Sequence, residues 1–180
     1  MQAAIRTDGG QTGTTISENI IYNATSQGIL TKLDNRIENN IVVNVIAPPR
    51  GFYLSVREGP LTGVIQRNIF YSLSANDTFI DELAPGKESS TEDARGRPLA
   101  LAKDADLDYN IYFCVPDPEK GKELIEKNQK DGIDLHSRAV DPMFVDAANG
   151  DFRLKPGSPA LEMGIVPIDV SKIGLRKIEK

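Results

Sequence analysis

The chain contains little cysteine, little histidine and few aromatic residues, and each shortage excludes a class of protein. Its 180 residues include one cysteine (Cys114), one histidine (His136) and no tryptophan. A single cysteine cannot form an internal disulfide, and with one histidine it cannot complete a zinc site of Cys and His ligands. The sequence also lacks a glycine-rich phosphate loop and a nucleophile elbow. We therefore expect neither a metal nor a cofactor.

Long apolar runs and an excess of basic residues are missing as well. No stretch approaches the roughly 20 apolar residues that a transmembrane helix needs, and the first residues, Met-Gln-Ala-Ala-Ile-Arg, do not form a signal peptide. The 21 basic and 26 acidic residues give a net charge of −5, whereas nucleic-acid binding requires clustered positive charge. We expect no membrane and no nucleic acid as partner, and the localisation stays open.

What the chain does contain is an internal repeat centred on the dipeptide Asn-Ile. Each copy has an aliphatic residue, two mostly polar residues, Asn-Ile, a β-branched or aromatic pair and a small residue. The four copies are Ile16–Asn23, Ile37–Asn44, Ile65–Ser72 and Leu107–Cys114. A fixed motif at a growing spacing is typical of a solenoid into which loops are inserted.

A second set of short segments alternates with this repeat. Each begins with a small residue and continues with a large apolar one, and turn-forming residues flank it. Aligned with one another, these segments are Ala4–Asp8, Gly28–Lys32, Gly51–Ser55 and Thr78–Glu82. One such strand cannot bury its own apolar face, but coils stacked about 4.8 Å apart can bury equivalent residues against each other.

The repeat therefore predicts an all-β fold, a parallel β-helix of about four coils over residues 1–115. We expect internal stacks of the equivalent aliphatic residues, and an asparagine ladder in which each amide hydrogen-bonds the next. The expected columns are Ile16/Ile37/Ile65/Leu107, Ile20/Ile41/Ile69/Ile111 and Asn19/Asn40/Asn68/Asn110. Residues 84–105 read as an inserted surface loop, or as a lid over a groove. A β-sandwich with coincidental Asn-Ile pairs is the alternative fold.

After Cys114 the repeat stops, and residues 116–180 read as a mixed C-terminal cap. Asp117-Pro118 is a helix-start signal that predicts a short helix over 119–130. The turn signal Asn149-Gly150-Asp151 predicts a hairpin or a last irregular coil. A cap is needed because the last coil would otherwise expose its apolar face and its strand edges.

These motifs carry a family resemblance. The chain resembles the C-terminal part of right-handed parallel β-helix proteins of the pectate-lyase-like superfamily, and more narrowly the large β-helix proteins that bacteria use on polysaccharides. The matching motifs are Asp8–Asn23, Ile37–Asn44 and the distal runs Asp134–Ser137, Asp141–Val145, Gly150–Leu154 and Ser158–Leu161. The resemblance implies a right-handed coil, a secreted or periplasmic location and a polysaccharide partner. It also implies a fragment or small relative of a polysaccharide-degrading hydrolase or lyase.

Strand alternation places one strip of side chains on the outer face of the second set of segments. The catalytic candidates on this strip are Asp8, Lys32 and Glu82, and the substrate-binding candidates are Arg6, Tyr53 and Arg57. Lyases of this architecture need a Lys or Arg base, whereas hydrolases need two carboxyl groups about 5–9.5 Å apart. Asp8 and Glu82 would lie three coils apart, roughly 14 Å, which is too far for such a pair. The alternative is a solvated face with ordinary salt bridges.

Three other residues have a mainly structural interpretation. Asp81 falls in the inward column of the alignment, which indicates a bend or a buried carboxylate. The lone His136 is expected to be a packed or capping residue. Cys114 occupies the small-residue position of the repeat, so we expect it to pack in the interior.

Two functions remain open from the sequence. One is a polysaccharide-active enzyme or enzyme fragment, with its groove along the outer strip. The other is a non-catalytic β-helix module that binds glycan passively or caps a larger assembly. Because the first coil leaves its N-terminal edge uncovered, we expect that end to be buried against another copy or another chain.

Overall fold

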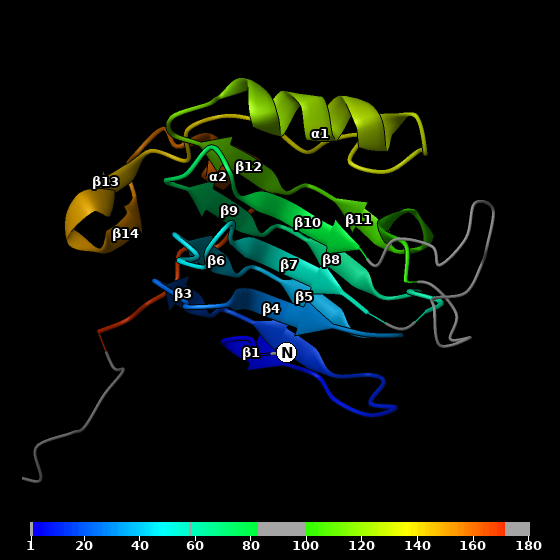
Figure 1. The fold of residues 1–180 in the computed structure, drawn as a ribbon. Coiled ribbons are helices and arrows are strands. Elements are labelled where there is room, and N and C mark those ends of the chain that lie inside the picture. The colour runs from blue at the N-terminus through cyan, green and yellow to red at the C-terminus, as the bar shows by residue number, and fades with distance from the viewer. Residues whose placement is uncertain (1, 58, 83–99, 172–180) are drawn as a thin grey trace, which may run out of the picture.

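The computed structural model describes residues 2–57, 59–82 and 100–171, and most of them wind through three parallel sheets (Figure 1). The first sheet contains β1 (Ile5–Arg6), β4 (Gln27–Thr31), β7 (Phe52–Val56) and β10 (Thr78–Glu82). The second contains β2 (Thr15–Ser17), β5 (Arg36–Glu38), β8 (Val64–Gln66) and β11 (Asp106–Asp108). The third contains β3 (Ile20–Tyr22), β6 (Ile41–Val43), β9 (Ile69–Ser72) and β12 (Ile111–Cys114). Every third strand returns to the same sheet, so the fold is consistent with a parallel β-helix.

A column of asparagines runs between the second and third sheets. Its members are Asn19, Asn40, Asn68 and Asn110. The Oδ1 atom of each later asparagine accepts hydrogen bonds from the backbone N–H and the side-chain Nδ2 of the preceding one, at 3.0–3.2 Å. Asn40, Asn68 and Asn110 are fully buried. We call this row the asparagine column; its amides satisfy one another, so burying them is not costly.

The residue before each of these asparagines takes a left-handed backbone conformation. The four residues are Glu18, Asn39, Arg67 and Tyr109, and their φ angles lie between 52° and 57°. Apart from glycine and, to a lesser degree, asparagine, residues adopt this region at a cost, so the surrounding hydrogen bonds must hold Glu18, Arg67 and Tyr109 there. The bend turns the chain from the second sheet into the third.

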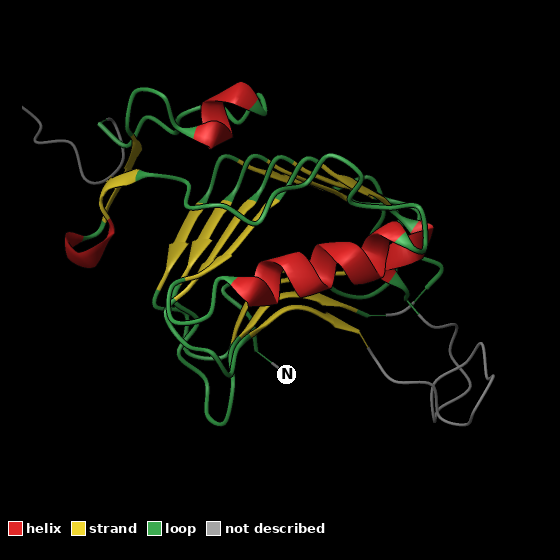
Figure 2. Cartoon of the chain, turned by 90° about the horizontal axis from the view of Figure 1, so that it is seen from above, coloured by secondary structure: helices red, strands yellow, loops and turns green. Residues whose placement is uncertain are grey.

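The aliphatic columns divide between two cores. The column of Ile16, Ile37, Ile65 and Leu107 is buried in the main core, together with Phe70 and Tyr112 of the third sheet. The expectation that the Ile20/Ile41/Ile69/Ile111 column shares this interior is wrong. These residues belong to a second core with Phe144, Phe152 and Ala160, in the segment that lies beside the third sheet (Figure 2). Alternation explains the difference, because Ile41 and the inward Val42 are neighbours on one strand and point to opposite faces.

The C-terminal third covers both an end and a side of the solenoid. Helix α1 (Glu119–Gln129) lies across the end beyond β12. A Cβ atom on Gly121 would collide with the backbone oxygen of Tyr112, so this close approach needs glycine. The remaining elements are η1 (Ala102–Asp104), β13 (Phe144–Asp146), η2 (Ala147–Asn149), β14 (Asp151–Leu154) and α2 (Pro159–Glu162). Strands β13 and β14 pair antiparallel as a hairpin.

Parts of two expected segments lie outside the described residues. The loop expected over 84–105 falls there except for 100–105, and the expected cap extends there beyond 171.

The register of the first sheet differs from the alignment made on sequence alone. Ile29 pairs with Leu54 rather than Phe52, and Leu54 in turn pairs with Ile80. Glu82 therefore lies beside Val56, and Asp81 beside Ser55. A shift by one residue moves a side chain to the opposite face of a strand. Asp81 thus shares a face with Arg6 and Leu30, and the expectation that it belongs to the opposite column is wrong. The expectation that Glu82 shares the face of Arg6 is also wrong.

The asparagine column yields a stability prediction. Replacing Asn68 by leucine leaves the backbone N–H of Asn40 and the carbonyl of Ile37 without partners in the interior. We expect the Asn68→Leu variant to lose about 3 kcal/mol of unfolding free energy, because each orphaned buried group costs about 1–3 kcal/mol. Chemical denaturation measures this loss.

Asn19→Leu is the matched control, since Asn19 donates to Asn40 but accepts nothing from another asparagine of the column. Its loss is expected to be about 1 kcal/mol. Equal losses in the two variants would contradict the expectation that an interior member of the column contributes more to stability than its first member.

Candidate functional site

The charged side chains at the edge of the first sheet pair with one another. Arg6 contacts Asp8 at 2.5 Å, Lys32 contacts Asp8 at 3.6 Å, and Arg57 pairs with Asp81. The hydrogen bond from Arg6 is the main cause that lowers the pKa of Asp8. The side chains of Lys32 and Arg57 are almost completely buried. The structure therefore brings Arg6, Asp8 and Lys32 together, but as an ion-pair cluster.

Two other candidates on the same sheet are held elsewhere. The Oε1 atom of Glu82 accepts a hydrogen bond from the backbone N–H of Ala102 at 2.5 Å. Tyr53 is fully buried, and its hydroxyl donates to Oδ2 of Asp77. The expectation that Tyr53 forms an exposed platform is wrong, because its ring packs against Phe79 in the interior.

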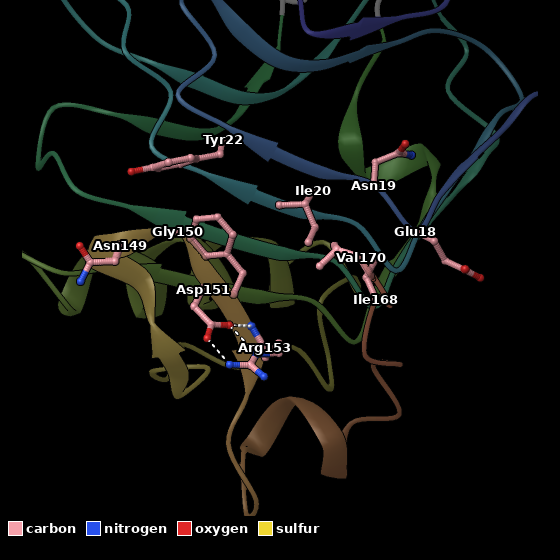
Figure 3. A pocket seen from close by; sticks show the side chains of 11 residues that line it. Glu18, Asn19, Ile20, Tyr22, Asn149, Gly150, Asp151, Arg153, Ile168 and Val170 are labelled. Atoms are coloured by element: carbon pink, nitrogen blue, oxygen red, sulfur yellow. Dashed lines mark hydrogen bonds and ion pairs between the residues drawn. The ribbon is translucent and has the colours of Figure 1, made fainter. Parts of the chain in front are cut away.

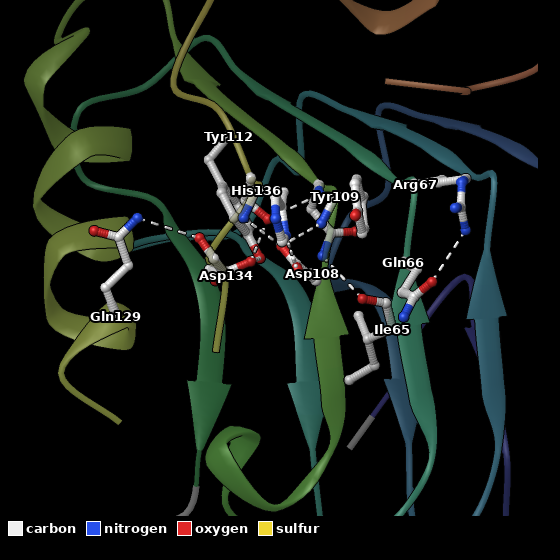
Figure 4. Close-up of polar contacts among 11 residues, drawn as sticks. Ile65, Gln66, Arg67, Asp108, Tyr109, Tyr112, Gln129, Asp134 and His136 are labelled. Atoms are coloured by element: carbon white, nitrogen blue, oxygen red, sulfur yellow. Dashed lines mark hydrogen bonds and ion pairs between the residues drawn. The ribbon is translucent and has the colours of Figure 1, made fainter. Parts of the chain in front are cut away.

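His136 lies on the outer side of the second sheet, in a stack of flat side chains (Figure 4). Its Nδ1 is 2.6 Å from Oδ2 of Asp108, and its ring stacks on Tyr109 at a centroid distance of 4.8 Å. The guanidinium of Arg67 lies over the ring of Tyr109, and its Cζ atom is 5.2 Å from the ring centroid. Cys114, the one thiol of the sequence, is fully buried. The His136–Asp108 pair therefore has no exposed thiol to activate.

The Ser137 hydroxyl terminates the asparagine column, and it is held by the buried carboxylate of Asp134. Asp134 accepts hydrogen bonds from the Tyr112 hydroxyl at 3.2 Å and from Asn128 Nδ2 at 2.6 Å. Ser137 donates to the same carboxylate, and its own oxygen accepts the backbone N–H of Asn110. Burial raises the pKa of Asp134 to about 6. The position of this network, directly after the last column asparagine, indicates a structural role.

A cleft of about 870 Å³ lies beside the third sheet (Figure 3). It opens between β3 of the first coil and the hairpin of β13 and β14. The lining residues are Glu18, Asn19, Ile20, Tyr22, Asn149, Gly150, Asp151, Phe152, Arg153, Ile168 and Val170. This volume is in the range of small-molecule sites.

The cleft combines an aromatic face with fixed charges. Tyr22 is 42% exposed, and the edge of its ring contacts Phe152 at a centroid distance of 5.0 Å. Asp151 accepts two hydrogen bonds from Arg153, at 2.8 and 2.5 Å. This pair lowers the pKa of Asp151 and raises that of Arg153. Both groups therefore stay ionised around neutral pH and offer hydrogen bonds rather than a transferable proton.

Sequence reasoning missed this cleft, although two of its signals were visible. Tyr22 lies two residues after the first Asn-Ile pair, and Asn149-Gly150-Asp151 is a turn signal. Gly150 has a φ of 80°, so the turn needs glycine there. The missing information was that the outer isoleucine column must be covered, which brings the hairpin against Tyr22.

The described part of the chain shows no group of three or more His, Cys, Asp or Glu side chains that could hold a metal ion. No helix within it is long and apolar enough to cross a membrane. Comparison with family models, with curated proteins and with solved structures finds no match for this chain.

The buried Asp134 predicts a specific pH dependence of stability. Its folded pKa of about 6 lies above the ordinary value of 3.8, so the folded state holds the proton more tightly. Its contribution is therefore most favourable below pH 4 and is lost as the pH rises through 6. We expect Asp134→Asn, which is neutral at every pH, to gain up to about 3 kcal/mol relative to wild type between pH 4 and 7.

Denaturation at both pH values measures this difference, and the exposed Asp131→Asn serves as control. A gap between wild type and Asp134→Asn that stays constant with pH would contradict the assignment.

Proposed function

We propose that this protein is a non-catalytic glycan-binding module. In this proposal it is a right-handed parallel β-helix of about four coils with an asparagine ladder, related to the pectate-lyase-like superfamily. Its partner is a polysaccharide, and the ligand lies in the cleft between β3 and the β13–β14 hairpin.

One observation carries the proposal: the exposed ring of Tyr22 shares an open cleft with the ionised Asp151–Arg153 pair. Sugar rings have apolar C–H faces and hydroxyl edges. An aromatic ring beside fixed donors and acceptors is suited to both parts. The amide of Asn149 adds further donors and acceptors at the rim of the cleft.

The charge state of the cleft favours binding over catalysis. A glycosidase needs a carboxyl group that keeps its proton near neutral pH, and a lyase needs a base that can lose one. The pKa of Asp151 is lowered and that of Arg153 is raised, both by their mutual hydrogen bonds. The lowered pKa makes Asp151 a poor general acid, and the raised pKa makes Arg153 a poor general base.

The alternative function is a hydrolase or lyase at the first sheet, with Asp8, Lys32 and Glu82 as its groups. Asp8 and Lys32 are in contact, which is the observation in its favour. Glu82 belongs to β10 and Asp8 follows β1, and these strands are the two outer ones of the sheet. The two carboxyl groups are thus separated by at least about 14 Å, beyond the range of a glycosidase pair.

The binding proposal is tested with Tyr22→Ala. Titration calorimetry against oligogalacturonate, alginate, cello- and xylo-oligosaccharides first identifies a ligand of the wild type. We expect the variant to bind that ligand at least about tenfold more weakly, because it loses the apolar platform. Tyr109→Ala, which removes a ring from a different outer face, is expected to bind like wild type. If no oligosaccharide binds, or if both variants bind equally, the proposal is wrong.

Catalysis is tested on the same panel of glycans. We expect neither an absorbance increase near 235 nm, which marks the unsaturated products of a lyase, nor new reducing ends. Either signal would favour the alternative function. If one of these signals is seen, the Lys32→Met variant tests where it arises. Loss of the signal in this variant would assign the activity to the first sheet.

A further inference from the structure

We infer that the cleft beside the third sheet selects uncharged oligosaccharides over polyuronates. This preference rests on the proposed glycan-binding function and deepens it, because it concerns the class of sugar that the same site accepts. It follows from the charges that line the cleft, from the hydrogen bonds that they leave open and from the apolar surface between them.

The charged groups that line the cleft carry an excess of negative charge. They are Glu18, Asp151 and Arg153, which together have a net charge of −1. Arg153 is already paired, since Asp151 accepts hydrogen bonds from its Nε and Nη2 atoms at 2.8 and 2.5 Å. Among the described residues Glu18 has no cationic partner, and Figure 3 shows its carboxylate well apart from the Asp151–Arg153 pair. A polyuronate would therefore bring its carboxylates to a guanidinium that is already neutralised, in a chain of net charge −5.

The hydrogen bonds that remain open around the cleft are mostly acceptors. Asn149 spends one of its amide hydrogens on Oδ2 of Asp146 at 2.7 Å, and the carboxylates of Glu18 and Asp151 can only accept. Arg153 keeps N–H groups that do not bond Asp151, but its single charge cannot neutralise a second carboxylate. Sugar hydroxyls donate as well as accept, whereas each uronate unit carries in addition a carboxylate that only accepts. The cleft therefore suits a sugar chain whose polar groups are hydroxyls.

Apolar side chains make up much of the remaining lining. Tyr22 is 42% and Val170 47% exposed, and Ile20 and Ile168 also line the cleft. An ionised group that lies against such a surface loses water without gaining a partner, which costs free energy. An uncharged sugar ring has no ionic hydration to lose there, so its C–H face can contact the ring of Tyr22 without that cost.

The preference is tested by titration calorimetry at low ionic strength with oligosaccharides of one length. Cellohexaose and xylohexaose are the uncharged probes, and hexagalacturonate and hexaguluronate are the charged ones. We expect an uncharged hexamer to bind at least about fivefold more tightly than either uronate, a factor that matches the modest repulsion between exposed charges. Methyl-esterified hexagalacturonate has the same backbone without the charges, and we expect it to bind more tightly than the acid form.

The Asp151→Asn variant tests the cause of this preference. It keeps the shape of the side chain but leaves Arg153 with an unpaired positive charge. We expect it to bind hexagalacturonate at least about threefold more tightly than the wild type does, and added salt to reduce that gain. Asp131→Asn makes the same change in net charge at an exposed residue that does not line the cleft, so we expect it to bind both classes like the wild type. Melting curves check that both variants are folded.

A uronate that binds as tightly as the best uncharged hexamer would overturn the inference and leave glycan binding intact. An acid form that binds more tightly than its methyl ester would do the same. So would an Asp151→Asn variant whose affinity for hexagalacturonate does not rise, or rises no more than that of Asp131→Asn. If no hexamer of either class binds, the proposed function itself is wrong, and the preference falls with it.

Discussion

The stacked amides of Asn19, Asn40, Asn68 and Asn110 are the constraint on which the rest of the structure depends. The Nδ2 atom of one asparagine donates to the Oδ1 atom of the next and so links neighbouring coils, and the residue before each asparagine turns the chain from one sheet to the next. This fixes which residues of the third sheet point inward and which point outward. The main core and the covered outer face both follow from that division.

The cleft is a consequence of the outward column. Ile41, Ile69 and Ile111 would expose a continuous apolar stripe if nothing covered them, and the segment from Phe144 to Ile165 covers it. That cover meets the first coil beside Tyr22, whose ring is left partly exposed next to charged hairpin residues. A structural need thus produces an aromatic and charged cleft, and the proposed glycan site uses it.

The sequence predicted the parallel sheets because the Asn-Ile motif repeats with matched columns, and the helix at Glu119–Gln129 because of its start signal. It failed where pairing depends on long-range packing. The segments of the first sheet differ in loop length, so one-residue shifts could not be seen, and these decide the faces of Asp81 and Glu82. The burial of Tyr53 depends on Asp77 and Phe79, which no local pattern connects to it.

The most direct test of the account is to map a bound oligosaccharide by nuclear magnetic resonance on the labelled chain. The account predicts that titration shifts the signals of residues 18–22 and 149–153, which line the cleft. Shifts confined to the first sheet, around Asp8, Lys32 and Arg57, would contradict it and would assign the glycan to the charged cluster instead.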